Sequence, residues 1–216
     1  MIGYYNYTVW LTYIGMASGV TGLACVLHGG KYSALFAVIC LLFSGFCDLF
    51  DGRVARMKKN RTNEERKFGI QIDSLSDLIC FGVLPTAIGY AVGLTEWYWL
   101  PLFCLYILTG LIRLAYYNVT EDSRQKKSTD VRHYYEGLPI TSAAITFPII
   151  FCLGTMAGAD KADIFKYVYA VAIAVTMVCF VAPIRVVKPR RLGTYVLIAV
   201  GGVIGGILLA TWMILA

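Results

Sequence analysis

Long apolar stretches recur along the 216-residue chain, and they constrain its fold more than any other feature. A helix needs about 20 predominantly apolar residues to cross the hydrocarbon core of a membrane. Stretches close to this length follow one another with mostly short links between them. The predicted spans are Leu11–Leu27, Tyr32–Met57, Phe68–Val92, Trp97–Asn118, Leu138–Ala157, Ile164–Ala182 and Thr194–Leu215.

The composition also indicates that lipid replaces water around most of this chain. Only 15% of the residues are charged, whereas soluble domains average about 25%. We therefore predict an all-α fold, a polytopic transmembrane helix bundle with six or seven spans. A chain of this length is expected to form a single integral membrane domain, residues 1–216, with the lipid bilayer as its surroundings.

The basic residues are concentrated in the links that follow the second, fourth and sixth spans. These links and the adjoining helix ends hold 16 of the 19 Lys and Arg residues, and the other links hold only Lys31, Lys161 and Lys166. Positive residues mark cytoplasmic loops, so we expect a multi-pass protein of the cell (inner) membrane with these links in the cytoplasm. We expect no nucleic-acid partner, because a protein that binds nucleic acid carries its basic face on a soluble fold.

Four aspartates fall where a membrane penalises charge: Asp48 and Asp51 near the end of the second span, and Asp73 and Asp77 near the start of the third. Residues three or four apart share one face of a helix, so each pair projects from one face. The two spans are consecutive and antiparallel, which places both pairs at the same depth. Charged groups inside a membrane are functional candidates by default.

Four carboxylates this close would repel one another unless cations lay between them. An all-oxygen cluster suits hard divalent cations, and we predict two ions of Mg²⁺ or Mn²⁺. Arg53 and Arg56 lie beside the cluster, and guanidinium groups match phosphate oxygens. Metals and arginines together are what a diphosphate ligand requires. Pairing of the aspartates with local Arg and Lys at the interface is the structural alternative.

The acidic motif resembles the signature of the CDP-alcohol phosphatidyltransferases. The matching stretches are Asp48-Leu49-Phe50-Asp51-Gly52-Arg53-Val54-Ala55-Arg56 and Gly69-Ile70-Gln71-Ile72-Asp73-Ser74-Leu75-Ser76-Asp77. The resemblance implies that Asp48, Asp51 and Asp73 bind the metals, and that Asp77 joins them or acts as the general base. It also implies that Gly52, Ala55 and Arg56 line the site for the CDP moiety.

The chain departs from the family pattern between the two halves of the signature, 48–77. The family usually has eight residues between the Arg and the Gly, and this chain has twelve, Met57 to Phe68. The additional residues fall in a polar run outside both acid-bearing faces. A loop or a helix extension absorbs four residues at little cost.

Later stretches resemble the serine-using branch of the family, the phosphatidylserine synthases. They are Phe81-Gly82-Val83-Leu84-Pro85, Arg113-Leu114-Ala115-Tyr116-Tyr117-Asn118 and Tyr135-Glu136-Gly137-Leu138-Pro139. That branch often has a second Arg where this chain has Tyr116. The resemblance implies transfer of a phosphatidyl group from CDP-diacylglycerol to serine, with release of CMP, by a homodimer.

The acceptor needs partners of both signs, because serine carries a carboxylate and an ammonium group. Arg113 is a lone cation in the fourth span and is the candidate for the carboxylate, or else it pairs with an aspartate. Asn118 and Glu136 are candidates for the amino group. Inositol phosphate or glycerol 3-phosphate are alternative acceptors, and a membrane metal transporter is an alternative class of function.

Overall fold

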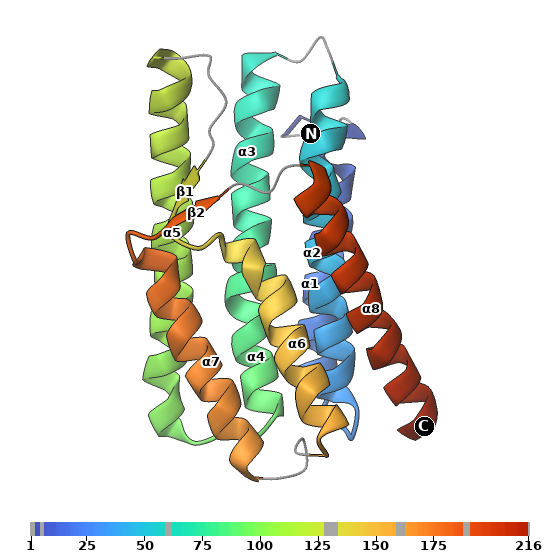
Figure 1. The fold of residues 1–216 in the computed structure, drawn as a ribbon. Helices are drawn as coiled ribbons and strands as arrows, with labels where there is room; N and C mark the ends of the chain where they lie inside the picture. The colour runs from blue at the N-terminus through green and yellow to red at the C-terminus, as the bar shows by residue number, and fades with distance from the viewer. Residues whose placement is uncertain are drawn as a thin grey trace.

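A computed structural model describes residues 3–4, 7–58, 62–127, 134–158, 163–187 and 191–215. The long helices run up and down in one bundle, with α8 leaning against one edge (Figure 1). The long elements of the bundle are α1 (Trp10–His28), α2 (Ser33–Met57), α3 (Asn63–Asp77), α4 (Leu84–Ala91), α5 (Leu100–Lys127), α6 (Ala143–Met156), α7 (Asp163–Val181) and α8 (Arg191–Leu215). Short elements join them: η1 (Tyr7–Val9), η2 (Leu78–Val83), η3 (Trp97–Trp99), β1 (Tyr134–Glu136), η4 (Ile140–Ser142) and β2 (Arg185–Val187).

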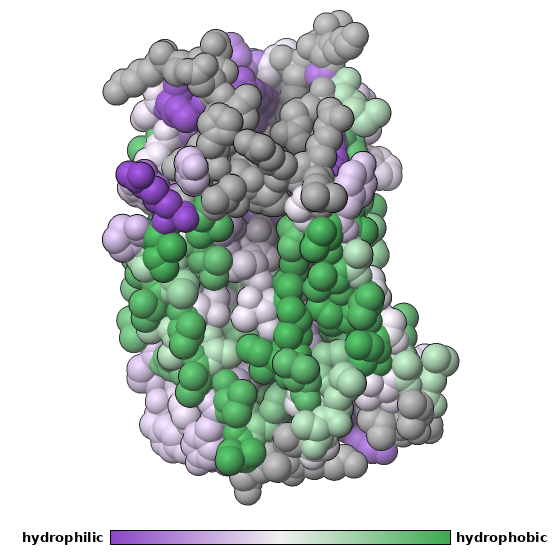
Figure 2. All heavy atoms as spheres, viewed as in Figure 1, coloured by the Kyte–Doolittle hydropathy of each residue, from purple (hydrophilic) through white to green (hydrophobic). Residues whose placement is uncertain are grey.

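The predicted all-α membrane bundle is confirmed. Among the described residues, six helical segments are long and apolar enough to cross a membrane, and a seventh, Ile140–Met156, is shorter. Hydrophobic residues cover the middle of the face in Figure 2, while most of the strongly hydrophilic ones gather toward its upper end. This upper end contains the start of α3 and the end of α5 (Figure 1).

The third span is one continuous helical segment, but its middle is a π-helix. α3 passes into η2 directly after Asp77, and α4 continues from Leu84. Pro85 explains the irregularity, because proline has no N–H to donate to the carbonyl of Phe81 and its ring crowds that carbonyl. The hydroxyl of Tyr106 on α5 donates to the Phe81 carbonyl at 3.0 Å instead.

Glycines let α1 lie close against the segments that carry the aspartates. A Cβ added to Gly15 would lie 3.1 Å from the Cβ of Cys47 on α2, and one added to Gly19 would lie 2.6 Å from the sulfur of Cys80 in η2. Small residues at such contacts allow two helix backbones to approach. The N-terminal half of α1 is thereby placed beside the acidic ends of α2 and α3.

A two-stranded antiparallel ladder, which the sequence did not predict, crosses the bundle near the acidic end. β1 pairs with β2 from Tyr134↔Val187 to Glu136↔Arg185, and it joins the segment before α6 to the segment after α7 (Figure 1). Three residues per strand are too few to produce a recognisable alternation of apolar and polar residues.

Candidate active site

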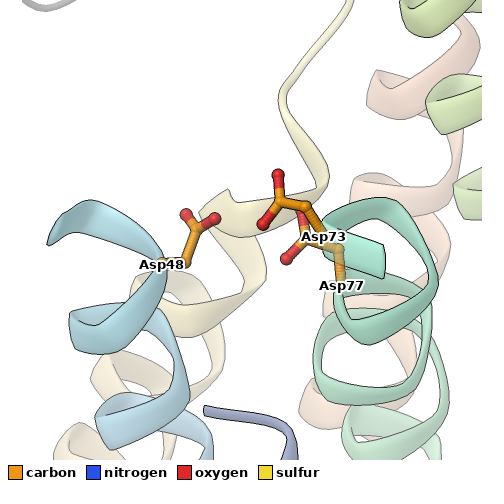
Figure 3. Close-up of side chains that lie close together, drawn as sticks. All are labelled: Asp48, Asp73 and Asp77. Atoms are coloured by element: carbon orange, nitrogen blue, oxygen red, sulfur yellow. The ribbon is translucent and has the colours of Figure 1, made fainter. Parts of the chain in front are cut away.

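Three of the four predicted aspartates converge between α2 and α3. Asp48 projects from α2 toward Asp73 and Asp77 on α3 (Figure 3). One carboxylate oxygen from each of the three lies within 4.8 Å of the others. The antiparallel arrangement of consecutive spans accounts for this meeting, because it brings the end of one helix beside the start of the next.

Asp51 lies in the wall of the same small cavity, one turn further along α2. It is buried, with 8% of its surface exposed. The hydroxyl of Thr12 on α1 donates a hydrogen bond to Asp51 Oδ2 at 3.0 Å. Asp51 is therefore also contacted from α1, a helix that the signature motif does not include.

The residues present fit a small hard cation. The Oδ1 atom of Asp73 is buried and has no hydrogen-bond partner among the described residues, and a buried carboxylate oxygen normally requires one. The cavity has a volume of about 10 Å³, which is the space of roughly one water molecule. Thr12, Ser44 and Ser76 line it beside the carboxylates. This space suits an ion coordinated by oxygen, whereas a nucleotide must lie outside it.

The residues that the resemblance assigns to the CDP moiety follow the first two aspartates on α2. Gly52 is exposed, and a Cβ added there would meet no atom of the described residues within 4 Å. Packing against the described residues therefore does not require its small size, and its surface is open toward a ligand. Ala55 is half-buried one turn further on. Arg56 belongs to α2, but its side chain lies outside the described residues.

Asn118 and Glu136, two of the residues predicted to bind the acceptor substrate, take part in hydrogen bonds that link α5 to α3 and to β1. Asn118 donates a hydrogen bond to Ser74 Oγ at 2.8 Å, and Ser74 directly follows Asp73 on α3. Tyr116 donates one to Glu136 Oε2 at 2.7 Å. Tyr116, the position where the serine-using branch often has Arg, thus contacts one of the predicted acceptor residues.

Arg113 is buried, with 5% of its surface exposed, and its guanidinium group binds backbone carbonyls. Nε donates to the carbonyl of Leu138 at 3.1 Å, and Nη2 donates to that of Gly137 at 3.4 Å. Its guanidinium also lies 5.6 Å from the centre of the Tyr117 ring. Arg113 therefore anchors the segment that carries Glu136, and neither of these hydrogen bonds involves an aspartate.

The longer link between the two halves of the signature folds partly as helix. α2 continues to Met57 and α3 begins at Asn63. Thr62 and Glu65 form a capping box, in which each side chain binds the other's backbone N–H. Lys58 forms an ion pair with Glu65 at 2.9 Å. The described part of this link thus consists of the end of α2, Lys58 and the capped first turn of α3.

Thr12 is a member of the site that the sequence did not predict. A signal for it exists, because Thr12, Gly15, Gly19 and Gly22 recur on one face of α1, and all four are buried. A hydroxyl on such a small-residue face indicates a close polar contact. Nothing in the sequence, however, identified Asp51 as its partner 39 residues away.

This chain belongs to the CDP-alcohol phosphatidyltransferase family. The family model matches residues 5–182, a range that includes α1 through α7 and all four aspartates. The resemblance drawn from the signature motif is thereby confirmed. No solved structure shows a significant match to the chain.

Several curated relatives carry the name CDP-diacylglycerol–serine O-phosphatidyltransferase. The Saccharomyces cerevisiae protein is 34% identical over 150 residues, which are 65% of this chain and 53% of that protein. The Helicobacter pylori protein (strain 26695) is 33% identical over 137 residues, 61% of this chain and 52% of that protein. The Bacillus subtilis protein is 29% identical over 146 residues, 66% of this chain and 79% of that protein. The match thus spans about half the length of the first two relatives.

Proposed function

We propose that this chain transfers a phosphatidyl group from CDP-diacylglycerol to serine, forming phosphatidylserine and CMP. Membership in the CDP-alcohol phosphatidyltransferase family supports the reaction type. The names of the yeast and bacterial relatives support serine as the acceptor.

The observation that carries the proposal is the convergence of Asp48, Asp73 and Asp77 within 4.8 Å. With Asp51 beside them, these residues would hold divalent cations, Mg²⁺ or Mn²⁺. When bound, such cations would offset negative charge on the diphosphate and on the departing CMP. The buried Asp73 Oδ1 supports this assignment, because a cation would supply the partner that none of the described residues provides.

The reaction would be one direct displacement at the phosphorus atom attached to diacylglycerol. The serine hydroxyl oxygen forms the new P–O bond, the bond to the CMP oxygen breaks, and CMP leaves with that electron pair. Asp77 is proposed to accept the hydroxyl proton, since it lies at the deeper end of the α3 acid pair and lines the cavity. Gly52, Ala55 and Arg56 would hold the CDP moiety along α2, where Gly52 leaves the surface open.

The acceptor would bind on the side of α3 that faces α5 and β1. Asn118 contacts Ser74 beside the acidic cluster, and Arg113 holds the segment that presents Glu136. We infer that Arg113 acts on the acceptor largely through this segment, while Asn118 and Glu136 provide polar groups for the serine ammonium.

The proposal includes the setting of the enzyme. The concentration of Lys and Arg at the acidic end of the bundle supports a site that faces the cytoplasm from the cell (inner) membrane. The exposed apolar surface of the helices supports insertion in a bilayer. A homodimer remains a prediction from the family resemblance.

The test is release of CMP from CDP-diacylglycerol by the purified protein in detergent or nanodiscs. Serine, inositol, inositol phosphate and glycerol 3-phosphate serve as alternative acceptors, with Mg²⁺, Mn²⁺ or EDTA present. We expect release that requires a divalent cation and is fastest with serine. Asp73→Asn should abolish it with every acceptor, whereas Glu96→Gln, an exposed acid in the link before η3, should retain it. A preference for another acceptor would overturn the serine assignment, and full activity in EDTA would overturn the metal assignment.

A further inference from the structure

We propose that Thr12 is a positioning residue that orients Asp51 toward the cations, an inference that rests on the proposed function of the acidic cluster. Thr12 lies on α1, outside the signature motif, and its hydroxyl donates to Asp51 Oδ2 at 3.0 Å. Both residues are buried, each with 8% of its surface exposed. The hydrogen bond is therefore largely shielded from bulk water.

The hydrogen bond from Thr12 orients the Asp51 carboxylate relative to the cavity. Asp48, Asp73 and Asp77 form the compact group, and Asp51 stands at its edge. A carboxylate at the edge of the group needs its own restraint to hold its orientation. With Oδ2 bound to Thr12, Oδ1 is the oxygen that this arrangement offers to a cation. Hydrogen bonds to a ligand carboxylate commonly orient it and tune its metal affinity.

A hydroxyl is a suitable partner at this position for an electrostatic reason. A Lys or Arg bound to Asp51 would neutralise it and compete with the metal. The threonine hydroxyl donates one hydrogen bond and brings no net charge, so it satisfies an oxygen while leaving the carboxylate negative. Threonine is also β-branched, which restricts its side-chain torsion in a helix.

The position of Thr12 is held by the packing of α1 described above. Gly15, one turn further on, contacts Cys47 next to Asp48, and the Ser44 hydroxyl donates to the Gly15 carbonyl at 2.9 Å. The register between α1 and α2 is thus fixed within one turn of Thr12. This rigid placement is what a positioning residue requires, because a loosely held donor would not orient its partner.

The test measures Mn²⁺ binding by the purified protein, from the electron paramagnetic resonance signal of free Mn²⁺ during titration. Thr12→Val keeps the shape and removes the hydroxyl, and we expect affinity to fall roughly 10- to 100-fold, the range typical for a lost partner of a metal ligand. Thr12→Ser restores a hydroxyl and should recover most of the affinity. CMP release measured in parallel should require correspondingly more Mn²⁺ in Thr12→Val.

Ser18→Ala is the matched control, because Ser18 also joins α1 to α2 through its hydroxyl but donates to the Cys40 carbonyl at 3.0 Å, not to a carboxylate. A purely structural role for Thr12 predicts that Thr12→Val and Ser18→Ala change Mn²⁺ affinity alike, and that result would overturn the inference. Equal affinity in Thr12→Val and the wild type would do the same while leaving the proposed function intact. A wild-type protein that binds no Mn²⁺ would instead overturn the metal site itself.

Discussion

The hydroxyl of Tyr106 donates a hydrogen bond to the carbonyl of Phe81 across 3.0 Å. This carbonyl lies in the π-helix η2, four residues before Pro85, which has no N–H to offer it. Tyr106 is fully buried in the aromatic centre of the bundle, against Phe147 and Phe180. The core of the bundle thus stabilises an irregular helix that begins directly after Asp77.

Tyr106→Phe should destabilise the protein because it leaves the Phe81 carbonyl buried without this partner. A carbonyl left unsatisfied costs roughly 1–3 kcal/mol, which corresponds to a fall in Tm of about 2–4 °C per kcal/mol for a protein of this size. The measurement is thermal unfolding in detergent. Tyr90→Phe removes a hydroxyl from a side chain that is 54% exposed and should leave Tm unchanged. Equal Tm values for both variants would show that the buried bond contributes nothing.

Gly137→Ala should distort the segment that Arg113 holds. Gly137 has φ +77°, and an added Cβ would lie 2.7 Å from the Phe180 carbonyl oxygen. Gly158→Ala is the matched control, since Gly158 has φ +64° but an added Cβ there would meet no described atom within 4 Å. The left-handed conformation alone costs about 1–2 kcal/mol for alanine. We expect Gly137→Ala to lower Tm clearly more than Gly158→Ala, and the opposite order would contradict the role of this close contact.

Arg113→Ala should lower Tm and raise the KM for serine more than the KM for CDP-diacylglycerol. The change removes the hydrogen bonds to Gly137 and Leu138 and so loosens the segment that carries Glu136. Arg124→Ala, on the same helix, removes an ion pair with Glu121 that is partly exposed, and such pairs contribute at most about 1 kcal/mol. Steady-state kinetics and thermal unfolding check both variants. An unchanged KM for serine in Arg113→Ala would show that Arg113 takes no part in binding the acceptor.

Removal of metal should expose repulsion within the acidic cluster. In EDTA, Asp73→Asn should unfold at a higher temperature than the wild type, because it removes a carboxyl group whose ionised form is disfavoured by burial and by the neighbouring acids. Adding Mg²⁺ should raise the Tm of the wild type, since a ligand that binds only the folded state stabilises it, and should raise that of Asp73→Asn less. Thermal unfolding with and without Mg²⁺ provides the measurement. Equal shifts in both proteins would mean that the cation binds elsewhere.

The sequence by itself determined the membrane bundle and most of the acidic cluster. Apolar length alone defines a spanning helix, because the bilayer leaves the backbone few other ways to satisfy its hydrogen bonds. Helical spacing placed Asp48 with Asp51 and Asp73 with Asp77, and consecutive antiparallel spans brought three of these four together within 4.8 Å. Local periodicity and short connections were sufficient for this part of the site.

Only the tertiary structure decided how the cluster is supported. The contact of Thr12 with Asp51 joins residues 39 positions apart, and the ladder of β1 with β2 joins segments about 50 positions apart. The positive charge of Arg113 predicted from the sequence that it binds the carboxylate of the acceptor. In the fold, its guanidinium group donates hydrogen bonds to two backbone carbonyls. Such contacts depend on how the packed helices are rotated and shifted in depth relative to one another. The side-chain volumes of the whole core determine this arrangement, and no local sequence pattern encodes it.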